Sequence, residues 1–143
     1  MTQRLVVDAS VAAAWLLGEP ALAARAHAVL QSLARARMLV PAIWQAEVGN
    51  VLVVKERQQR IDAACAQRFL HLLEGLDCEV DAAAATTTFD RVLPLARRHQ
   101  LSAYDAVYLE LALRAQAPLA TFDEALGRAA LREGVEVRDG TAA

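Results

Sequence analysis

The stretch LSAYDAVYLELALRAQAPLATFDEAL, residues 101–126, predicts a helix, a short strand and the start of a second helix. Apolar residues recur at helical spacing over 102–116, and the short apolar run PLAT (118–121) separates this segment from a helical stretch at 124–133. The same alternation runs through the chain. Strands are predicted at 4–8, 38–41, 78–81, 118–121 and 135–137, and helices at 10–17, 20–36, 42–57, 62–73, 88–99, 102–116 and 124–133.

Short strands that alternate with longer helices are typical of a parallel sheet with helices on both faces. We therefore expect a three-layer α/β/α fold with a short-stranded, mainly parallel central sheet. The 143 residues contain no repeat, no low-complexity tract and no Gly/Ser linker, so a single domain over 1–143 is expected. Pro94 lies inside the predicted helix 88–99, where it should cause a kink or mark an early turn.

The composition narrows the class of protein. Apolar runs such as VAAAWLL are far shorter than the roughly 18 residues that a transmembrane helix needs, and residues 1–10 do not resemble a signal peptide. The two cysteines lack metal-binding spacing and do not make a disulfide framework. We therefore expect a cytoplasmic protein without a membrane partner. The net charge of −2 argues against a broad basic surface for nucleic acid, although a local patch remains possible.

Glu47 is the residue that least fits a purely structural role. In PAIWQAEVGNVLVVK (41–55) the apolar residues fall on one side of a helix, and Glu47 interrupts that side. A buried carboxylate without a partner costs several kcal/mol, so the sequence requires a partner for Glu47.

Three further acids fall where predicted strands end or helices begin. Asp8 ends the first strand, Asp105 lies in the first turn of the helix after Ser102, and Asp123 follows the strand 118–121. Each also has a structural explanation, because Asp8 can cap the following helix in place of Ser10, and 102–105 and 121–124 have capping-box spacing. Since the carboxyl ends of parallel strands share one edge of a sheet, all four acids can meet there.

Clustered carboxylates need positive charge between them. Two carboxylates ~4 Å apart repel by about 4 kcal/mol at an effective dielectric constant of 20. Oxygen ligands without a neighbouring His or Cys favour Mg²⁺ or Mn²⁺ over zinc. The four acids therefore suggest a magnesium or manganese site.

Taken together, these segments resemble the PIN-domain family, in particular the VapC-type toxin ribonucleases. The resemblance rests on VVDASVAAAWLLGE at the start, PAIWQAEVGNVL in the middle and LSAYDAVYLELALRAQAPLATFDEAL near the end. It covers almost the whole chain, with the acids in the expected order.

The resemblance implies a metal-dependent endoribonuclease in which Asp8, Glu47, Asp105 and Asp123 are the catalytic residues and metal ligands. It also implies that Ser10 and Thr121 orient the first and last of these acids by hydrogen bonds. By the same resemblance the substrate is tRNA or rRNA, a small VapB-type antitoxin is the partner, and the protein is a homodimer.

Basic residues near two predicted helix ends are candidates for substrate binding, although they equally suit solvated helix ends that complement the helix dipole. They are Lys55, Arg57, Arg60, Arg97 and Arg98. The sequence disfavours two other classes of protein. A non-catalytic PIN-like module that binds RNA or a protein is disfavoured by the complete set of acids. A phosphotransfer domain is disfavoured because position 10 is Ser and Lys55 is the only lysine.

Overall fold

A five-stranded parallel sheet forms the centre of the computed structural model, which describes residues 3–82 and 87–141. The strand order is β3-β2-β1-β4-β5, and every neighbouring pair is parallel. The strands are β1 (Gln3–Val7), β2 (Ala36–Pro41), β3 (Cys78–Asp81), β4 (Leu119–Ala120) and β5 (Val137–Arg138). The predicted α/β class with a parallel sheet is confirmed.

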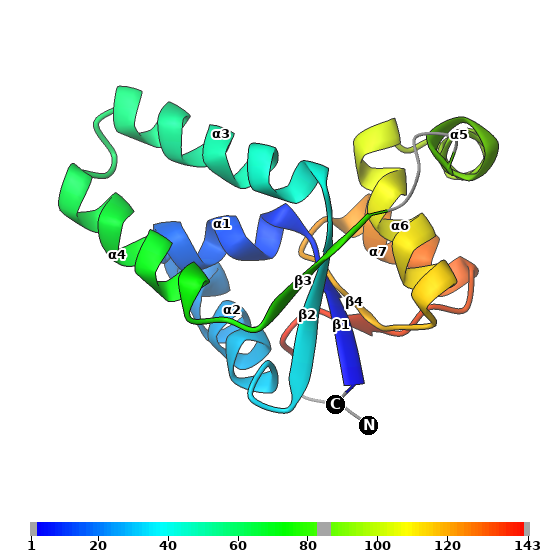
Figure 1. Cartoon of the computed structure of the whole chain (residues 1–143), viewed down its shortest axis with the longest axis horizontal. Helices are drawn as coiled ribbons and strands as arrows, with labels where there is room; N and C mark the ends of the chain where they lie inside the picture. The colour runs from blue at the N-terminus through cyan, green and yellow to red at the C-terminus, as the bar shows by residue number, and fades with distance from the viewer. Residues whose placement is uncertain (1–2, 83–86, 142–143) are drawn as a thin grey trace.

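Helices cover the sheet from two sides. Figure 1 shows α1 to α4 on one side and α5 to α7 on the other. Their bounds are α1 (Ala9–Leu17), α2 (Pro20–Ser32), α3 (Ile43–Arg57), α4 (Ala63–Glu74), α5 (Leu93–His99), α6 (Ala103–Ala115) and α7 (Glu124–Arg132). A π-helical turn, η1 (Thr88–Val92), passes directly into α5, and Pro94 lies in the first turn of α5. None of the described helices is long and apolar enough to cross a membrane.

Several element boundaries and one helix cap differ from those predicted. The helix expected over 20–36 ends at Ser32, because the next residues turn and Ala36 already pairs with Gln3 in the sheet. The last strand lies at Val137–Arg138 rather than 135–137, since the backbone N–H of Val135 bonds to Ala130 at the end of α7. Asp8, not Ser10, occupies the N-cap position of α1, and neither side chain makes the capping hydrogen bond.

The order of the strands determines where a site can form. In chain order, β2 and β3 are added on one side of β1, whereas β4 and β5 are added on its other side. The direction in which strands are added therefore reverses beside β1. In open parallel sheets, ligands bind at the carboxyl ends of the strands next to such a reversal. Asp8 directly follows β1, and its backbone N–H bonds to Ala120 in β4 at 2.9 Å. The carboxyl ends of the adjacent strands β1 and β4 are therefore the expected place for a site.

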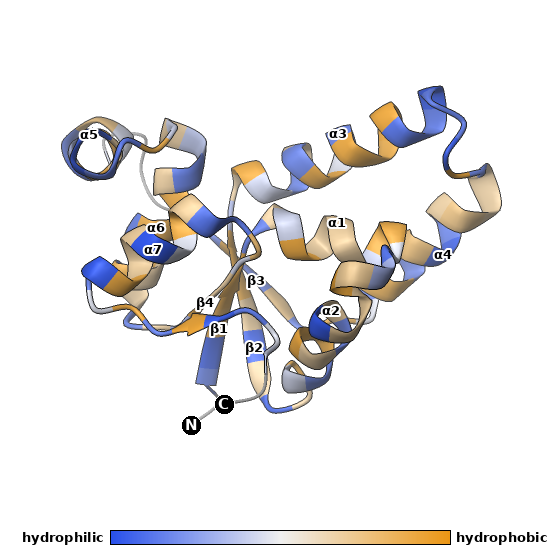
Figure 2. Cartoon of the chain, turned by 180° about the vertical axis from the view of Figure 1, so that it is seen from behind, coloured by the Kyte–Doolittle hydropathy of each residue, from blue (hydrophilic) through white to orange (hydrophobic). Residues whose placement is uncertain are grey.

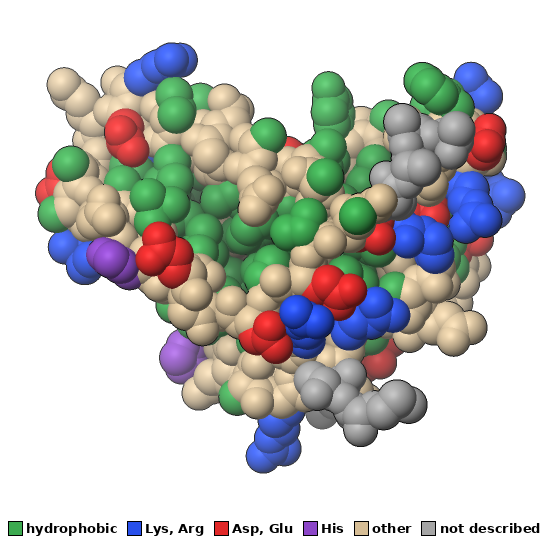
Figure 3. Space-filling view, in the orientation of Figure 1, with side chains coloured by type: hydrophobic (Ala, Val, Ile, Leu, Met, Phe, Trp, Pro, Cys, Tyr) green, Lys and Arg blue, Asp and Glu red, His purple; other side chains and the backbone are tan. Residues whose placement is uncertain are grey.

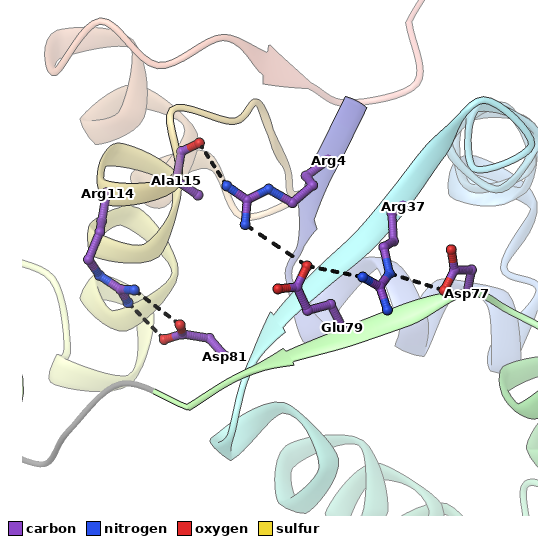
Figure 4. A network of polar contacts seen from close by, with 7 residues as sticks. All are labelled: Arg4, Arg37, Asp77, Glu79, Asp81, Arg114 and Ala115. Atoms are coloured by element: carbon purple, nitrogen blue, oxygen red, sulfur yellow. Dashed lines mark hydrogen bonds and ion pairs between the residues drawn. The ribbon is translucent and has the colours of Figure 1, made fainter. Parts of the chain in front are cut away.

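Part of the sheet faces solvent through a ladder of charged side chains. Arg4 on β1 and Arg37 on β2 both pair with Glu79 on β3, with N–O distances of 3.9 and 3.6 Å. Arg37 also pairs with Asp77 at 3.1 Å (Figure 4). Figure 3 shows acidic and basic side chains alternating in a row on this face. All four are well exposed, so each pair contributes little, about 0–1 kcal/mol.

A second group of charges surrounds one buried carboxylate. Glu110 on α6 is only 5% exposed and accepts hydrogen bonds from Arg114 at 2.8 and 3.1 Å. The same guanidinium forms two bonds of 3.0 and 2.7 Å with Asp81 at the end of β3 (Figure 4). Arg91 approaches Glu110 to 4.0 Å. Arg114 thus joins α6 to β3 and neutralises a buried carboxylate.

Replacement of Arg114 by leucine should therefore cost much more stability than replacement of Arg37. Arg114→Leu leaves Glu110 buried beside the more distant Arg91, and we expect a loss of about 3 kcal/mol in the free energy of unfolding. Arg37→Leu should lose less than about 1 kcal/mol. Urea denaturation at pH 7 measures both. Equal losses would contradict this account, and a Glu110→Leu change added to Arg114→Leu should restore most of the stability.

Candidate active site

Four carboxylates from four separate elements meet at the carboxyl end of the sheet. Asp8 follows β1 and Asp123 follows β4, while Glu47 lies in α3 and Asp105 in the first turn of α6. They are close enough that the charges of Asp8 and Asp105 each raise the pKa of Glu47, and the charges of Asp8 and Asp123 each raise that of Asp105. The structure therefore brings together the four acids that the sequence singled out.

Asp8 is held by two hydroxyl groups. Its Oδ2 accepts hydrogen bonds from Ser10 at 2.7 Å and Thr121 at 2.9 Å, and its side chain is almost fully buried. Burial raises the pKa of the Asp8 carboxyl, the hydrogen bonds from Ser10 and Thr121 lower it in part, and the charge of Asp123 raises it further. The charged form of Asp8 is thus held in place by neutral donors.

The same two hydroxyls also fix the loop between β4 and α7. Ser10 Oγ accepts from the backbone N–H of Phe122 at 3.1 Å, and Thr121 Oγ1 accepts from that of Asp123 at 3.0 Å. Both hydroxyls therefore orient Asp8 directly, but in the described structure Thr121 meets Asp123 only at its backbone. Through the Thr121 hydroxyl, the backbone of Asp123 is held in a fixed position relative to the Asp8 carboxylate.

Glu47 has a side-chain partner within the protein. The hydroxyl of Tyr108 donates a hydrogen bond to Glu47 Oε1 at 2.6 Å. Burial is the main cause that raises the pKa of the half-buried Glu47, the bond from Tyr108 lowers it, and the charges of Asp8 and Asp105 raise it again. Burial, followed by the bond to Glu47, raises the pKa of the Tyr108 phenol well above its usual range, so that the phenol stays a donor at neutral pH.

The capping explanations of Asp105 and Asp123 hold only in part. Ser102 caps α6 by accepting from the backbone N–H of Asp105 at 3.1 Å, and its hydroxyl also interacts with the Asp105 carboxylate, which lowers the pKa of that carboxyl in part. Asp123, not Thr121, is the N-cap of α7, and its Oδ1 accepts from the backbone N–H of Leu126 at 2.8 Å. Burial and the charges of Asp123 and Asp8 raise the pKa of Asp105. A cap alone does not require such a crowded position.

The four acids fit a hard divalent cation by their chemistry. None of the ion pairs in the described parts of the chain includes any of them, so no arginine or lysine neutralises the cluster there. An all-oxygen donor set of this kind suits Mg²⁺ or Mn²⁺. Within residues 3–82 and 87–141, however, no three acidic, histidine or cysteine side chains converge closely enough to form a ready metal cage. Metal binding would therefore draw the carboxylates closer together.

Three of the five basic substrate candidates lie further along α3 than Glu47 or beyond its end. Lys55, Arg57 and Arg60 are at the outer end of α3 and in the turn beyond it, where Figure 2 shows a hydrophilic segment. Lys55 is eight positions after Glu47 in the helix, which is about 12 Å along the axis. Lys55 contacts Gln58, and Arg60 pairs with Glu19 at 3.6 Å. In the described structure none of the five forms an ion pair with the four acids.

Arg98 has a structural contact that the sequence does not predict. It is at the end of α5 and forms an ion pair with Glu133, directly after α7. His99 Nε2 lies 3.3 Å from the same carboxylate, without the alignment of a hydrogen bond. Burial alone would raise the pKa of Glu133, but the interactions with His99 and Arg98 outweigh it and lower that pKa. Arg98 thus joins α5 to α7, whereas Arg97 is exposed at the same helix end.

Two contacts near the acids were missed by sequence reasoning. Tyr108 is three residues after Asp105 and therefore on the same side of α6, a spacing that could have suggested a shared site. Arg25 on α2 lies 4.9 Å from the centre of the Phe122 ring and donates a hydrogen bond to the carbonyl of Asp139 at 2.8 Å. No local pattern connects Arg25 with Phe122, because the contact depends on how α2 packs.

Glu47→Gln should stabilise the protein in the presence of EDTA. The raised pKa of Glu47 means that its ionised form is disfavoured in the folded state, so ionisation lowers the free energy of unfolding. This loss of stability is absent at pH values below the pKa of Glu47 in the unfolded state, and it is complete once the pH has risen through its pKa in the folded state. Glutamine removes this cost and can still accept from Tyr108. The melting temperature of the variant should exceed that of the wild type at pH 8, and the difference should shrink towards pH 4. A variant that is less stable than the wild type at pH 8 would contradict the repulsion.

Comparisons with known proteins agree with this architecture. Residues 5–131 match the family model described as the PIN domain. The crystal structure of PAE2754 from Pyrobaculum aerophilum is similar, with 27% identity, a TM-score of 0.67, and coverage of 96% of this chain and 85% of that chain.

The crystal structure of FitAcB from Neisseria gonorrhoeae is similar in fold, with 21% identity and a TM-score of 0.57. The match covers 95% of this chain and 97% of that chain. A search of curated proteins found no match.

Proposed function

The chain belongs to the PIN domain family, and from this premise we propose that it is a metal-dependent endoribonuclease of the VapC type, formed by one domain over residues 1–143. PIN domains are typically nucleases and generally use divalent metal ions. The observation that carries the proposal is the gathering of Asp8, Glu47, Asp105 and Asp123 without a basic partner in the described ion pairs.

In this proposal the four acids have different roles in phosphodiester hydrolysis. Asp8, Glu47 and Asp105 would hold a Mg²⁺ or Mn²⁺ ion, and Ser10 and Thr121 keep Asp8 in position. When bound, the ion supplies the positive charge that an anionic substrate needs and makes hydroxide accessible near neutral pH. Asp123 either contributes to a second metal position or accepts the proton of the attacking water at Oδ2, since Oδ1 accepts from Leu126.

No covalent intermediate with the protein is required. Water attacks the phosphorus and its proton passes to a carboxylate, while the bond from phosphorus to the 3′ oxygen breaks and this oxygen takes up a proton from solvent. By resemblance to the family, the products carry 5′-phosphate and 3′-hydroxyl ends. The exposed Arg97 and Arg57 are the basic candidates for contact with the RNA backbone, because no ion pair in the described structure involves them.

Asp8→Asn should abolish most of the cleavage. The purified wild-type protein should cut structured RNA in Mg²⁺ or Mn²⁺, and EDTA should stop the reaction. Asn at position 8 removes a charged ligand, and we expect a rate at least about 100-fold lower. Gel analysis of end-labelled tRNA and rRNA measures the rate and the product ends.

Asp77→Asn is the matched control, because Asp77 is exposed in the charged ladder of the sheet. This variant should cleave RNA like the wild type. Equal cleavage by wild type and Asp8→Asn would refute the assignment of the acids. Binding of RNA without cleavage would favour the non-catalytic PIN-like module instead.

We also propose that the protein is the toxin of a toxin–antitoxin pair, inhibited by a small VapB-type protein, and that it forms a homodimer. This part of the proposal rests on the resemblance of the sequence to VapC-type proteins. An antitoxin that inserts an arginine among the four acids would supply the cation that they lack.

Expression of the wild-type protein without its partner should slow bacterial growth, and Asp105→Ala should relieve the effect because it removes one of the clustered acids. Growth curves after induction measure the difference, with immunoblots to confirm equal protein levels. Identical growth of cells that express either form would exclude the toxin role and leave the nuclease assignment intact.

A further inference from the structure

Tyr108 connects the two helices that carry Glu47 and Asp105. It lies on α6, one turn after Asp105, with a side chain that is fully buried. Its hydroxyl reaches across to α3 and donates to Glu47 Oε1 at 2.6 Å. This length is within the range of a charge-assisted O–H···O bond. The contact is therefore a strong and specific one, made at the edge of the acid cluster.

We propose that Tyr108 is a positioning residue that holds the Glu47 carboxylate at the metal site and thereby sets the affinity of the protein for a divalent cation. The inference rests on the proposed nuclease function and assigns to Tyr108 a role in the same site. Tyr108 does not contact the cation in this proposal. It acts through Glu47.

Packing explains why Tyr108 can do this. Its ring is fully buried as part of the hydrophobic core, so that the hydroxyl has a fixed position. Glu47 is only half-buried, and a free glutamate side chain would sample several rotamers. The bond removes that freedom before a cation arrives. It also occupies Oε1, which leaves Oε2 as the atom of Glu47 proposed to bind the cation.

A purely structural role for Tyr108 predicts something different. If the tyrosine only filled the core, loss of its hydroxyl would change stability but not metal affinity. Partners that orient a metal ligand typically change metal affinity by about 10- to 100-fold when they are removed. Tyr108→Phe retains the ring and removes only the donor, so it separates the two roles.

The test is a direct titration of Mn²⁺ into the purified, metal-free protein, followed by isothermal calorimetry. Tyr108→Phe should bind Mn²⁺ about tenfold more weakly than the wild type. The matched control is Tyr104→Phe, the same change on the same helix at a side chain that is 66% exposed, and it should bind like the wild type. In a Glu47→Gln background, Tyr108→Phe should cause little further loss. Equal Mn²⁺ affinity of Tyr108→Phe and the wild type would overturn the inference.

A second measurement keeps the inference testable if Tyr108→Phe does not fold. The chain has two tyrosines, so Tyr104→Phe leaves Tyr108 as the single one. The tyrosine bands in the ultraviolet resonance Raman spectrum of that variant report the hydrogen bond of Tyr108. Mn²⁺ should shift these bands, and the additional change Glu47→Gln should abolish the shift. Unchanged bands at a saturating concentration of Mn²⁺ would refute the role of Tyr108.

The outcomes distinguish this inference from the proposed function. Failure of the wild type to bind Mn²⁺ and to cleave RNA would refute the nuclease assignment and the inference with it. Normal binding and cleavage by both the wild type and Tyr108→Phe would refute the role of Tyr108 alone. If Tyr108 acts as proposed, higher Mn²⁺ concentrations should restore cleavage by Tyr108→Phe, whereas they should not restore it in Asp8→Asn.

Discussion

Repulsion among Asp8, Glu47, Asp105 and Asp123 is the constraint on which the functional end of this fold depends. The strand order brings the ends of β1 and β4 together, and α3 and α6 start beside them, so the acids cannot avoid one another. Burial and the neighbouring acids raise the pKa values of three of them. A fold that only needed stability would place apolar or basic residues here. The unfavourable burial and repulsion of these carboxylates are compatible with a site that binds positive charge.

Neutral groups rather than arginines hold these acids in place. Ser10 and Thr121 bond to Asp8, and Tyr108 bonds to Glu47. Elsewhere in the described chain the buried Glu110 is treated in the opposite way, because Arg114 neutralises it directly. Hydroxyl donors fix the direction of a carboxylate without cancelling its charge. The protein therefore orients the acids for an external cation and retains their attraction for it.

Sequence reasoning succeeded where the cause was local. Periodicity located α3 and α6 closely, and Asp8, Asp105 and Asp123 could be placed because each one follows a strand or begins a helix. Glu47 was singled out for a different reason, as a carboxylate inside an apolar helical pattern. It failed where the cause was tertiary. The end of α2 at Ser32 depends on the pairing of Ala36 with β1, since no glycine or proline marks it. The partner of Glu47 was expected to be a metal, and the hydroxyl of Tyr108 was missed because the contact requires α3 and α6 to approach each other.

The tyrosine and a metal ion are compatible partners for Glu47, because they use different parts of the carboxylate. Oε1 accepts from the buried phenol, which fixes the direction of the side chain, and Oε2 is left for the proposed cation. The carboxylate as a whole lies close enough to Asp8 and Asp105 that their charges raise its pKa. The apolar side of α3 therefore does two things at once. Trp44 and Val48 pack into the core, while Glu47 between them ends the packed region and begins the acidic one. An acidic residue that interrupts an apolar helical pattern indicates a binding site when a buried neighbour, here Tyr108, donates a hydrogen bond to it without neutralising its charge.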